Sequence, residues 1–557
     1  MFPANIVNII IGIFSCSYCL SYPPEFKYGV LKAYNMMNHG EIQESPARVK
    51  YIPYIGIYDS LAHLNERYRN KRTCPVHEYA QHQIISNLRR ALKVFLIGVG
   101  CDSRRGWVRA FESWLICSKY LDGLQNDFEN MHDDLEESQY TGFIGDLAAL
   151  ENMNIIKANK VASKFRNVAF MAKLRLSRFR GKLIELSANL NTVLGEESSQ
   201  VDFPYQDSSL KVIASIRTDT ITFSLLPNRN LYKVSILNTY AAKLKQLWVN
   251  HKAIIKLVNK LNISNFSTTL GREENKNCND FEDLKKAIDR IASSDTLNFD
   301  ESKYLDWQYD NVPAIGAESH FDLNSNGDKD NFLNDVFCVL SRYDTIEGHG
   351  LQAALPHSVM QMLRKHFGVM VECFSSPLNT VTPFYCSAFP DTDIPFGSLG
   401  SFFDFFPTSG SFEVNPPFVP AIINQTSSHI DHLLARAAGP MSFVVVIPYW
   451  ERDPFFQTLV SNVYIRNVTR VPAGQHSYCD GVQHRRNTAE IHRPAPFDTA
   501  VIFLQNEEGA KTWTVTEDSV RNVLDAFRFS AEHAVGRVVD AYIPRRMRNA
   551  AADDTGE

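Results

Sequence analysis

Residues 410–418 read GSFEVNPPF, a short β-rich run that leads directly into two prolines. The next segment, VPAIINQTSSHIDHLLARAA at 419–438, has the spacing of a helix, and MSFVVVIPYW at 441–450 is a second apolar strand. A strand, a loop, a helix and a strand in this order predict a βαβ unit with a parallel sheet. Ligands of such sheets bind beyond the carboxyl ends of the strands, which is where Asn415 falls.

The tetrapeptide Asn415-Pro416-Pro417-Phe418 has the groups that methyl transfer to an adenine amine requires. The N6 lone pair is delocalised into the ring, so acceptors for its N–H bonds must hold the amine in its nucleophilic form. The side-chain oxygen of Asn415 and the backbone carbonyl of Pro416 are the candidate acceptors, and the consecutive prolines keep the turn rigid. Phe418 is the candidate stacking surface for the base. The alternative is a proline-rich turn after a strand.

Two upstream segments are candidates for binding the methyl donor, S-adenosylmethionine. The first, VECFSSPLN at 371–379, follows an apolar strand, and its acid is suited to the amino group of the cofactor. Its candidate residues are Glu372, Phe374, Ser375, Ser376, Pro377 and Asn379. The second, at 391–400, offers acids for ribose hydroxyls and an aromatic ring for adenine, although an ordinary Asp/Gly turn explains it equally well. Its candidate residues are Asp391, Asp393, Phe396, Gly397 and Ser398.

The pattern along the chain predicts an α/β fold with a large helical domain before it. Residues 336–530 are predicted to form a Rossmann-like methyltransferase domain, with VMVECF and TAVIFLQN as further strands. Residues 75–335 show helical periodicity, for example HEYAQHQIISNLRRALKVFLI, and end in an acidic linker. Residues 1–74 are an N-terminal extension and 531–557 a polar tail. The apolar run at 6–20 is either a buried extension or a targeting segment, and it is short for a membrane span.

Charge gives only local indications of RNA binding, because the 557-residue chain has a net charge of −5. Residues 155–184 carry nine basic side chains and no acidic one, which predicts either a phosphate-binding helix or a solvated face. Trp450 at a strand end is a candidate to stack on a cap, or else a Trp that closes a core. The candidate RNA contacts are Lys173, Arg175, Arg178, Arg180, Trp450, His484 and Arg485.

No metal site is predicted. Of the ten cysteines only Cys16 and Cys19 form a CxxC pair, and reduced thiols are the simplest interpretation. Residues 322–328 imitate the start of a calcium loop, but Leu333 stands where the bidentate Glu is required, which favours an Asx-rich turn.

Several unusual short sequence motifs occur in a fixed order between residues 340 and 507. They are VECFSSPLN, YCSAFPDTD, FGSLGSFFDF, GSFEVNPPF, FVVVIPYW and TAVIFLQN. In this order they resemble the cap-specific adenosine-N6 methyltransferases, the phosphorylated-CTD-interacting-factor proteins. The resemblance implies methyl transfer from S-adenosylmethionine to N6 of the adenosine next to the cap of messenger RNA, usually already 2′-O-methylated. It also implies that residues 415–418 are catalytic, that 372–379 bind the cofactor and that the helical domain helps to form an RNA groove.

Two departures from that family pattern stand out. We find no WW module, since the first tryptophan is Trp107, and therefore expect no WW-mediated contact with the polymerase tail. In the segment 447–451, Tyr449 replaces the family's Glu before Trp450. The open alternatives are an enzyme for DNA or internal RNA adenines and a non-catalytic RNA-binding homologue. The arginines at 545, 546 and 548 suggest a nuclear protein, and no membrane partner is expected.

Overall fold

The computed structural model describes the chain from Thr73 to Glu532, with gaps. The described residues are 73–101, 104–121, 143–150, 152–194, 212–217, 219–225, 232–260, 326–346, 353–382, 384–486 and 491–532. The apolar run at 6–20, the pair Cys16 and Cys19 and the arginines near residue 546 lie outside this part of the chain.

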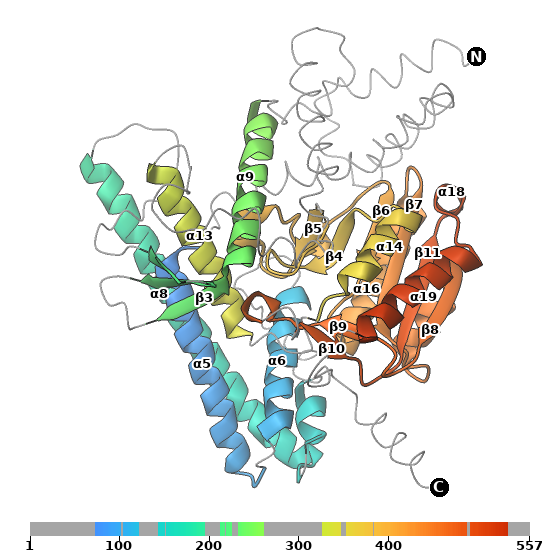
Figure 1. Ribbon diagram of the computed structural model, residues 1–557. Helices are drawn as coiled ribbons and strands as arrows, with labels where there is room; N and C mark the ends of the chain where they lie inside the picture. Colours follow the sequence, from blue (N-terminus) through green and yellow to red (C-terminus); the bar gives the residue numbers. More distant parts are fainter. Residues whose placement is uncertain are drawn as a thin grey trace, which may run out of the picture.

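A six-stranded mixed sheet forms the centre of the carboxyl-terminal half (Figure 1), in the order β5-β4-β6-β7-β11-β8. The strands are β4 (Val371–Ser375), β5 (Phe384–Ser387), β6 (Gly410–Val414), β7 (Met441–Pro448), β8 (Ile465–Val471) and β11 (Thr499–Gln505). Neighbours among β5, β4, β6 and β7 are parallel, whereas β11 runs antiparallel to both β7 and β8. The predicted α/β class is therefore confirmed, with a mixed sheet.

The predicted βαβ unit is present. Helix α16 (Pro420–Arg436) links β6 to β7, as the patterns at 410–450 predicted. Each residue of β7 is buried, in keeping with an interior strand covered on both faces. The other helices and turns here are α14 (His357–Phe367), α15 (Pro390–Asp393), η7 (Ile394–Phe396), η8 (Phe402–Asp404), α17 (Pro454–Val460), η9 (Gln483–Arg485), α18 (Glu507–Thr512) and α19 (Glu517–Glu532). A small sheet pairs β9 (Ser477–Cys479) with β10 (His492–Pro494).

The amino-terminal half is mainly helical, as predicted, but it also contains a small sheet. The helices are α5 (Pro75–Ile97), α6 (Arg104–Leu121), α8 (Ile155–Leu194), α9 (Asn238–Lys260) and α13 (Asn326–Thr345). The unforeseen sheet is antiparallel and consists of β1 (Val212–Ile216), β2 (Thr220–Leu225) and β3 (Lys233–Leu237). Residues 326–333 begin α13, so the Asx-rich turn expected around them is wrong for this stretch.

The two halves share a hydrophobic core. One buried cluster fills the large sheet, while a second joins the helical half to Leu378, Phe389 and Phe396 of the sheet half. Helix α13 also runs through the expected domain boundary at 335/336, and the boundary itself stays a prediction. No helix in the described part of the chain combines the length and apolar character needed to cross a bilayer.

Candidate functional site

Asn415 lies immediately after β6 and is 7% exposed. Its amide nitrogen Nδ2 donates to the carbonyl of Ala353 at 3.0 Å, which fixes the orientation of the side chain. Its oxygen Oδ1 is buried and has no hydrogen-bond partner among the described residues. Because a buried unpaired acceptor is costly, this atom is suited to receive a donor from a bound ligand.

The two prolines that follow hold a tight turn. The carbonyl of Pro417 accepts from the backbone N–H of Val419 at 2.6 Å, just before α16 begins at Pro420. A proline at the first helical position is favourable because its missing N–H would be unpaired there in any case. The turn therefore sets the start of α16 and the position of Asn415 together.

Phe418 has a different environment from the one its proposed stacking role requires. Its ring is buried and contacts Tyr478 and Phe497 edge-on, with centroid distances of 5.8 and 5.6 Å. Neither face is offered to a base in this arrangement. Phe418 therefore anchors the turn in the hydrophobic core, and direct stacking stays a prediction.

Glu372 on β4 organises the loop that follows it. Its two carboxylate oxygens accept hydrogen bonds from Ser375 Oγ at 3.0 Å, Thr380 Oγ1 at 2.9 Å, Val381 N at 2.7 Å, Thr382 N at 2.8 Å and Thr382 Oγ1 at 2.9 Å. These five hydrogen bonds tie the side chain of Glu372 to the loop at residues 375–382. The predicted contact with a cofactor amino group stays a prediction, because the loop already occupies both oxygens.

The rest of the 372–379 segment is a compact turn. Asn379 Oδ1 accepts from Ser376 N at 2.8 Å and from the hydroxyls of Ser375 and Ser376 at 3.0 and 2.7 Å. Phe374 packs against Phe402 and Phe403, and Pro377 lies within the turn. The small serine side chains thus allow the turn to close on itself. Contact of these serines with a ligand stays a prediction.

Lys243 reaches this loop from α9 in the helical half. Its Nζ donates to the carbonyl of Leu378 at 3.4 Å, and burial lowers the pKa of Lys243 to about 8 in spite of the favourable charge of Glu372. The helical half therefore places a positive charge beside the loop on β4.

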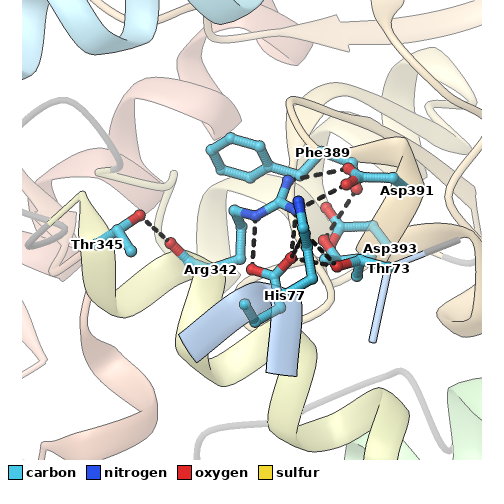
Figure 2. A network of polar contacts seen from close by, with 9 residues as sticks. Thr73, His77, Arg342, Thr345, Phe389, Asp391 and Asp393 are labelled. Carbon is cyan, nitrogen blue, oxygen red and sulfur yellow. Dashed lines mark hydrogen bonds and ion pairs between the residues drawn. The ribbon is translucent and has the colours of Figure 1, made fainter. Parts of the chain in front are cut away.

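A buried ionic network joins Asp391 to the helical half (Figure 2). The guanidinium of Arg342 on α13 donates to Asp391 at 3.0 and 2.7 Å and to Glu78 on α5 at 2.8 and 2.5 Å. Burial alone would raise the pKa of Glu78, but the charge of Arg342 and the hydrogen bonds to His77 and Arg342 hold it well below its usual range. The guanidinium also lies over the ring of Phe389, 5.2 Å from its centroid.

Asp393 belongs to the same turn and is equally engaged. Its Oδ2 accepts from Tyr343 Oη at 2.6 Å and its Oδ1 from Thr392 Oγ1 at 2.8 Å. Burial raises the pKa of Asp393 to about 7, and these hydrogen bonds oppose the rise. The predicted ribose contacts of Asp391 and Asp393 stay predictions, since both carboxylates have internal partners here.

The remaining residues of the second cofactor segment are also internal. Phe396 is fully buried in the core shared by the two halves, so a role beside adenine stays a prediction. Gly397 adopts a φ of +93°, a conformation that favours glycine. The hydroxyl of Ser398 lies 2.7 Å from that of Ser387 at the end of β5.

The candidate RNA contacts divide into two groups. Lys173, Arg175, Arg178 and Arg180 fall on α8, but their side chains lie outside the described part of the structure. Trp450 is 3% exposed and meets Phe455 edge-on, which is the core position weighed as its alternative. Arg485 pairs with Asp344 at 2.6 Å. The ring of Trp450 closes the core in this structure, and its stacking on a cap stays a prediction.

His484 is also directed inward. Both ring nitrogens are buried without a hydrogen-bond partner among the described residues, and burial, followed by the charges of Arg485 and Lys243, lowers its pKa to about 3. The neighbouring Gln483 accepts from Tyr240 Oη at 3.0 Å, so η9 is fixed against α9. His484 is thus a neutral buried imidazole, which is not suited to bind exposed phosphates.

Glu413 is the functional candidate that sequence analysis missed. It is 2% exposed on β6, directly opposite Glu372 on β4 in the parallel register. Burial, and then the charge of Glu372, raise the pKa of Glu413 well above its ordinary value. The available signal was a charged residue in a strand of otherwise apolar character, two positions before Asn415.

Comparison with known proteins gives one family-model match and similar curated proteins from two mammals. A family model described as "Phosphorylated CTD interacting factor 1 WW domain" matches residues 318–481. The mRNA (2'-O-methyladenosine-N(6)-)-methyltransferase of Homo sapiens is 42% identical over 214 residues, which are 37% of this chain and 30% of the human protein. The Mus musculus protein of the same name is 42% identical over 207 residues, which are 36% and 29% of the two chains. The matched segment thus spans about a third of the length of these relatives.

The family match corrects one prediction. We expected the chain to lack the WW module of the family, but the model that carries this description matches residues 318–481, so that prediction is wrong. The expectation of no WW-mediated contact with the polymerase tail is withdrawn with it. The matched residues include the helices and strands from α13 to β9, and therefore the turn that carries Asn415.

Proposed function

We propose that this chain transfers a methyl group from S-adenosylmethionine to N6 of the cap-adjacent 2′-O-methyladenosine of capped messenger RNA. The observation that carries the proposal is the buried, unpaired Oδ1 of Asn415. It is supported by the 42% identity, over 214 residues, to a protein named for that reaction. The candidate cofactor residues at 372–379 lie on and after β4, which is paired with β6. Those at 391–398 follow β5, on the other side of β4.

We further propose that residues 336–530 form a Rossmann-like methyltransferase domain. The order of the parallel strands, with β6 between β4 and β7, places Asn415 beyond the carboxyl end of a central strand. The antiparallel β11 between β7 and β8 completes the sheet on the far side. Ligands of doubly wound sheets bind at this edge, which supports the assignment.

The residues at the site suit an amine substrate. The cofactor supplies an electrophilic methyl group when bound. Asn415 Oδ1 accepts an N–H of the target amine, and the hydrogen bond from Nδ2 to Ala353 keeps that acceptor oriented. The rigid turn at Pro416 and Pro417 fixes the carbonyl of Pro416 as a second acceptor. Fixed acceptors stabilise the positive charge that develops on the amine during transfer, without a strong general base.

Capped RNA is the proposed partner, with the helical domain at 75–335 contributing to its groove and α8 supplying basic side chains. We also propose a nuclear location, on the basis of the arginines at 545, 546 and 548.

Methyl transfer from labelled S-adenosylmethionine to two matched RNAs tests the proposed function. Both RNAs begin with adenosine, and only one carries the cap. We expect label in N6,2′-O-dimethyladenosine of the capped RNA alone when the first nucleotide is 2′-O-methylated. Equal labelling of both RNAs would instead assign the enzyme to internal RNA adenines, and labelling of an adenine-containing DNA duplex would assign it to DNA. The absence of both labelling and cofactor binding would overturn the assignment as a methyltransferase.

A further inference from the structure

Glu413 lies on β6, two residues before Asn415, which directly follows the end of this strand. Side chains alternate along a β-strand, so residues two apart share a face. Phe412 and Val414, the residues of opposite parity, are both part of the hydrophobic core of the sheet. By this alternation the carboxyl group of Glu413 lies on the face of β6 opposite to Phe412 and Val414. The unpaired Oδ1 of Asn415 belongs to the residue that follows the strand.

The two neighbouring acids Glu372 and Glu413 have unequal surroundings. Glu372 has five hydrogen-bond donors from its own loop, and Lys243 contributes a positive charge beside it. No donor to Glu413 is found among the described residues, although its side chain is almost fully buried. The titratable groups that interact electrostatically with Glu413 are Glu372, Cys373 and Tyr478, and none of them supplies a positive charge.

A carboxyl group in this position has two ways to avoid an uncompensated buried charge. It can hold a proton, which burial and the charge of Glu372 favour because both raise the pKa of Glu413. Alternatively, it can lose the proton when a cation from outside the protein is bound beside it. The Oδ1 of Asn415, unpaired and in a side chain more than nine-tenths buried, independently indicates that a ligand is accommodated at this end of β6.

We propose that Glu413 binds a cationic group of S-adenosylmethionine and that binding of this cofactor expels one proton from Glu413 to the solvent. The inference rests on the proposed function, since a methyl-donating sulfonium cofactor is the cation it invokes. The O–H bond of the carboxyl breaks, the proton is taken up by buffer, and the carboxylate pairs with the bound cation. Glu372 holds the loop after β4 through its five hydrogen bonds, and its own contact with the cofactor stays a prediction.

Proton release can be measured directly by calorimetry of cofactor binding to the full chain. S-adenosylmethionine is titrated at neutral pH in phosphate and in Tris, whose ionisation enthalpies differ, so the difference in heat gives the number of protons released. We expect release approaching one proton for the natural protein. For Glu413→Gln we expect none, with affinity about tenfold lower because a charge-assisted pair is lost. Glu508→Gln, an exposed acid on α18, is the matched control and should match the natural protein.

S-adenosylhomocysteine, which keeps the ammonium but has a neutral sulfur, distinguishes the two cationic groups. Proton release with this ligand assigns Glu413 to the ammonium, and its absence assigns Glu413 to the sulfonium. If Glu413→Gln is poorly folded by circular dichroism, the natural protein alone still tests the role of Glu413. Its proton release on cofactor binding should vanish at high pH, where the carboxyl group has already lost its proton, and release that persists there would contradict the role. Equal proton release by natural protein and Glu413→Gln, or none by the natural protein while it binds the cofactor, would overturn the role of Glu413 alone. A failure of the natural protein to bind the cofactor would overturn the proposed function as well.

Discussion

Arg342 on α13 donates through Nη1 and Nη2 to the two carboxylate oxygens of Asp391, at 3.0 and 2.7 Å. Asp391 is the acidic partner that the sheet half contributes. The other partner is Glu78 on α5, so one buried cation joins two helices of the amino-terminal half to the turn after β5. Because this turn follows the strand beside β4, the geometry at the sheet edge depends on a residue from the helical half.

Replacing Arg342 should destabilise the protein strongly. Arg342→Met leaves Glu78 and Asp391 buried without their cation, which costs about 3–5 kcal/mol in comparable cases. Urea unfolding followed by circular dichroism measures the loss. Arg528→Met removes an exposed arginine from its pair with Asp525 and should cost less than about 1 kcal/mol. Similar losses for the two variants would contradict a stabilising role for the buried network.

Asp393 should make stability fall as the pH rises. The pKa of its buried carboxyl is raised to about 7 from an ordinary value of 3.8, so the folded state holds a proton that the unfolded state has lost. The contribution is full below the ordinary value and is lost as the pH rises through about 7, by at most about 4 kcal/mol. The free energy of unfolding of Asp393→Asn, measured between about pH 5 and about pH 8, should fall less than that of the natural protein. Asp525→Asn, an exposed change, should leave the slope unaltered.

Local pattern was sufficient to predict the central part of the fold. The helix expected at 419–438 is observed at Pro420–Arg436, and the strand expected from residue 441 is β7. Both were predictable because the apolar period and the proline positions are set by neighbours along the chain. The short strands β1 to β3 were missed, since the surrounding helical periodicity outweighed runs of five or six residues.

The internal hydrogen bonds and ion pairs of the candidate cofactor residues could not be predicted from local pattern. Arg342 is 264 positions from Glu78 and 49 from Asp391, so no local pattern links them. In the sequence, an acidic residue after a strand looks the same whether it contacts a ligand or an arginine from a distant helix. Glu413 shows the converse, since its importance follows from burial and from the register with Glu372, neither of which a single sequence displays.

The basic residues of α8 should bind RNA through phosphates if the helical half contributes to the groove. Charge reversal of Arg175, Arg178 and Arg180 to Glu should weaken RNA binding and reduce its dependence on salt concentration, because fewer counterions are released. Fluorescence anisotropy with capped RNA over a salt series measures both effects. If the dependence of RNA affinity on salt concentration is unchanged, these arginines belong to a solvated helix face that does not contact RNA.

Trp450 should affect stability rather than cap recognition. Its ring is buried against Phe455, and truncation of a buried aromatic side chain to alanine typically costs about 3–5 kcal/mol. Thermal and urea unfolding of Trp450→Ala should show this loss, whereas Val463→Ala, at an exposed position, should change stability by less than about 0.5 kcal/mol. If Trp450→Ala instead loses affinity for the cap while it keeps full stability, Trp450 is a cap-binding residue.

Asn415 should be required for methyl transfer far more than for folding. Asn415→Ala removes the unpaired acceptor Oδ1 and the hydrogen bond from Nδ2 to Ala353. We expect transfer to fall by a hundredfold or more, about what the loss of one preorganised polar group costs, and stability to fall by only about 1 kcal/mol. Labelled methyl transfer and urea unfolding measure the two effects, and anisotropy should give nearly unchanged RNA affinity. Asn424→Ala, on the exposed side of α16, should behave like the natural protein. Retained turnover by Asn415→Ala would remove Asn415 from the catalytic assignment, because no other group on this turn can replace its side-chain acceptor.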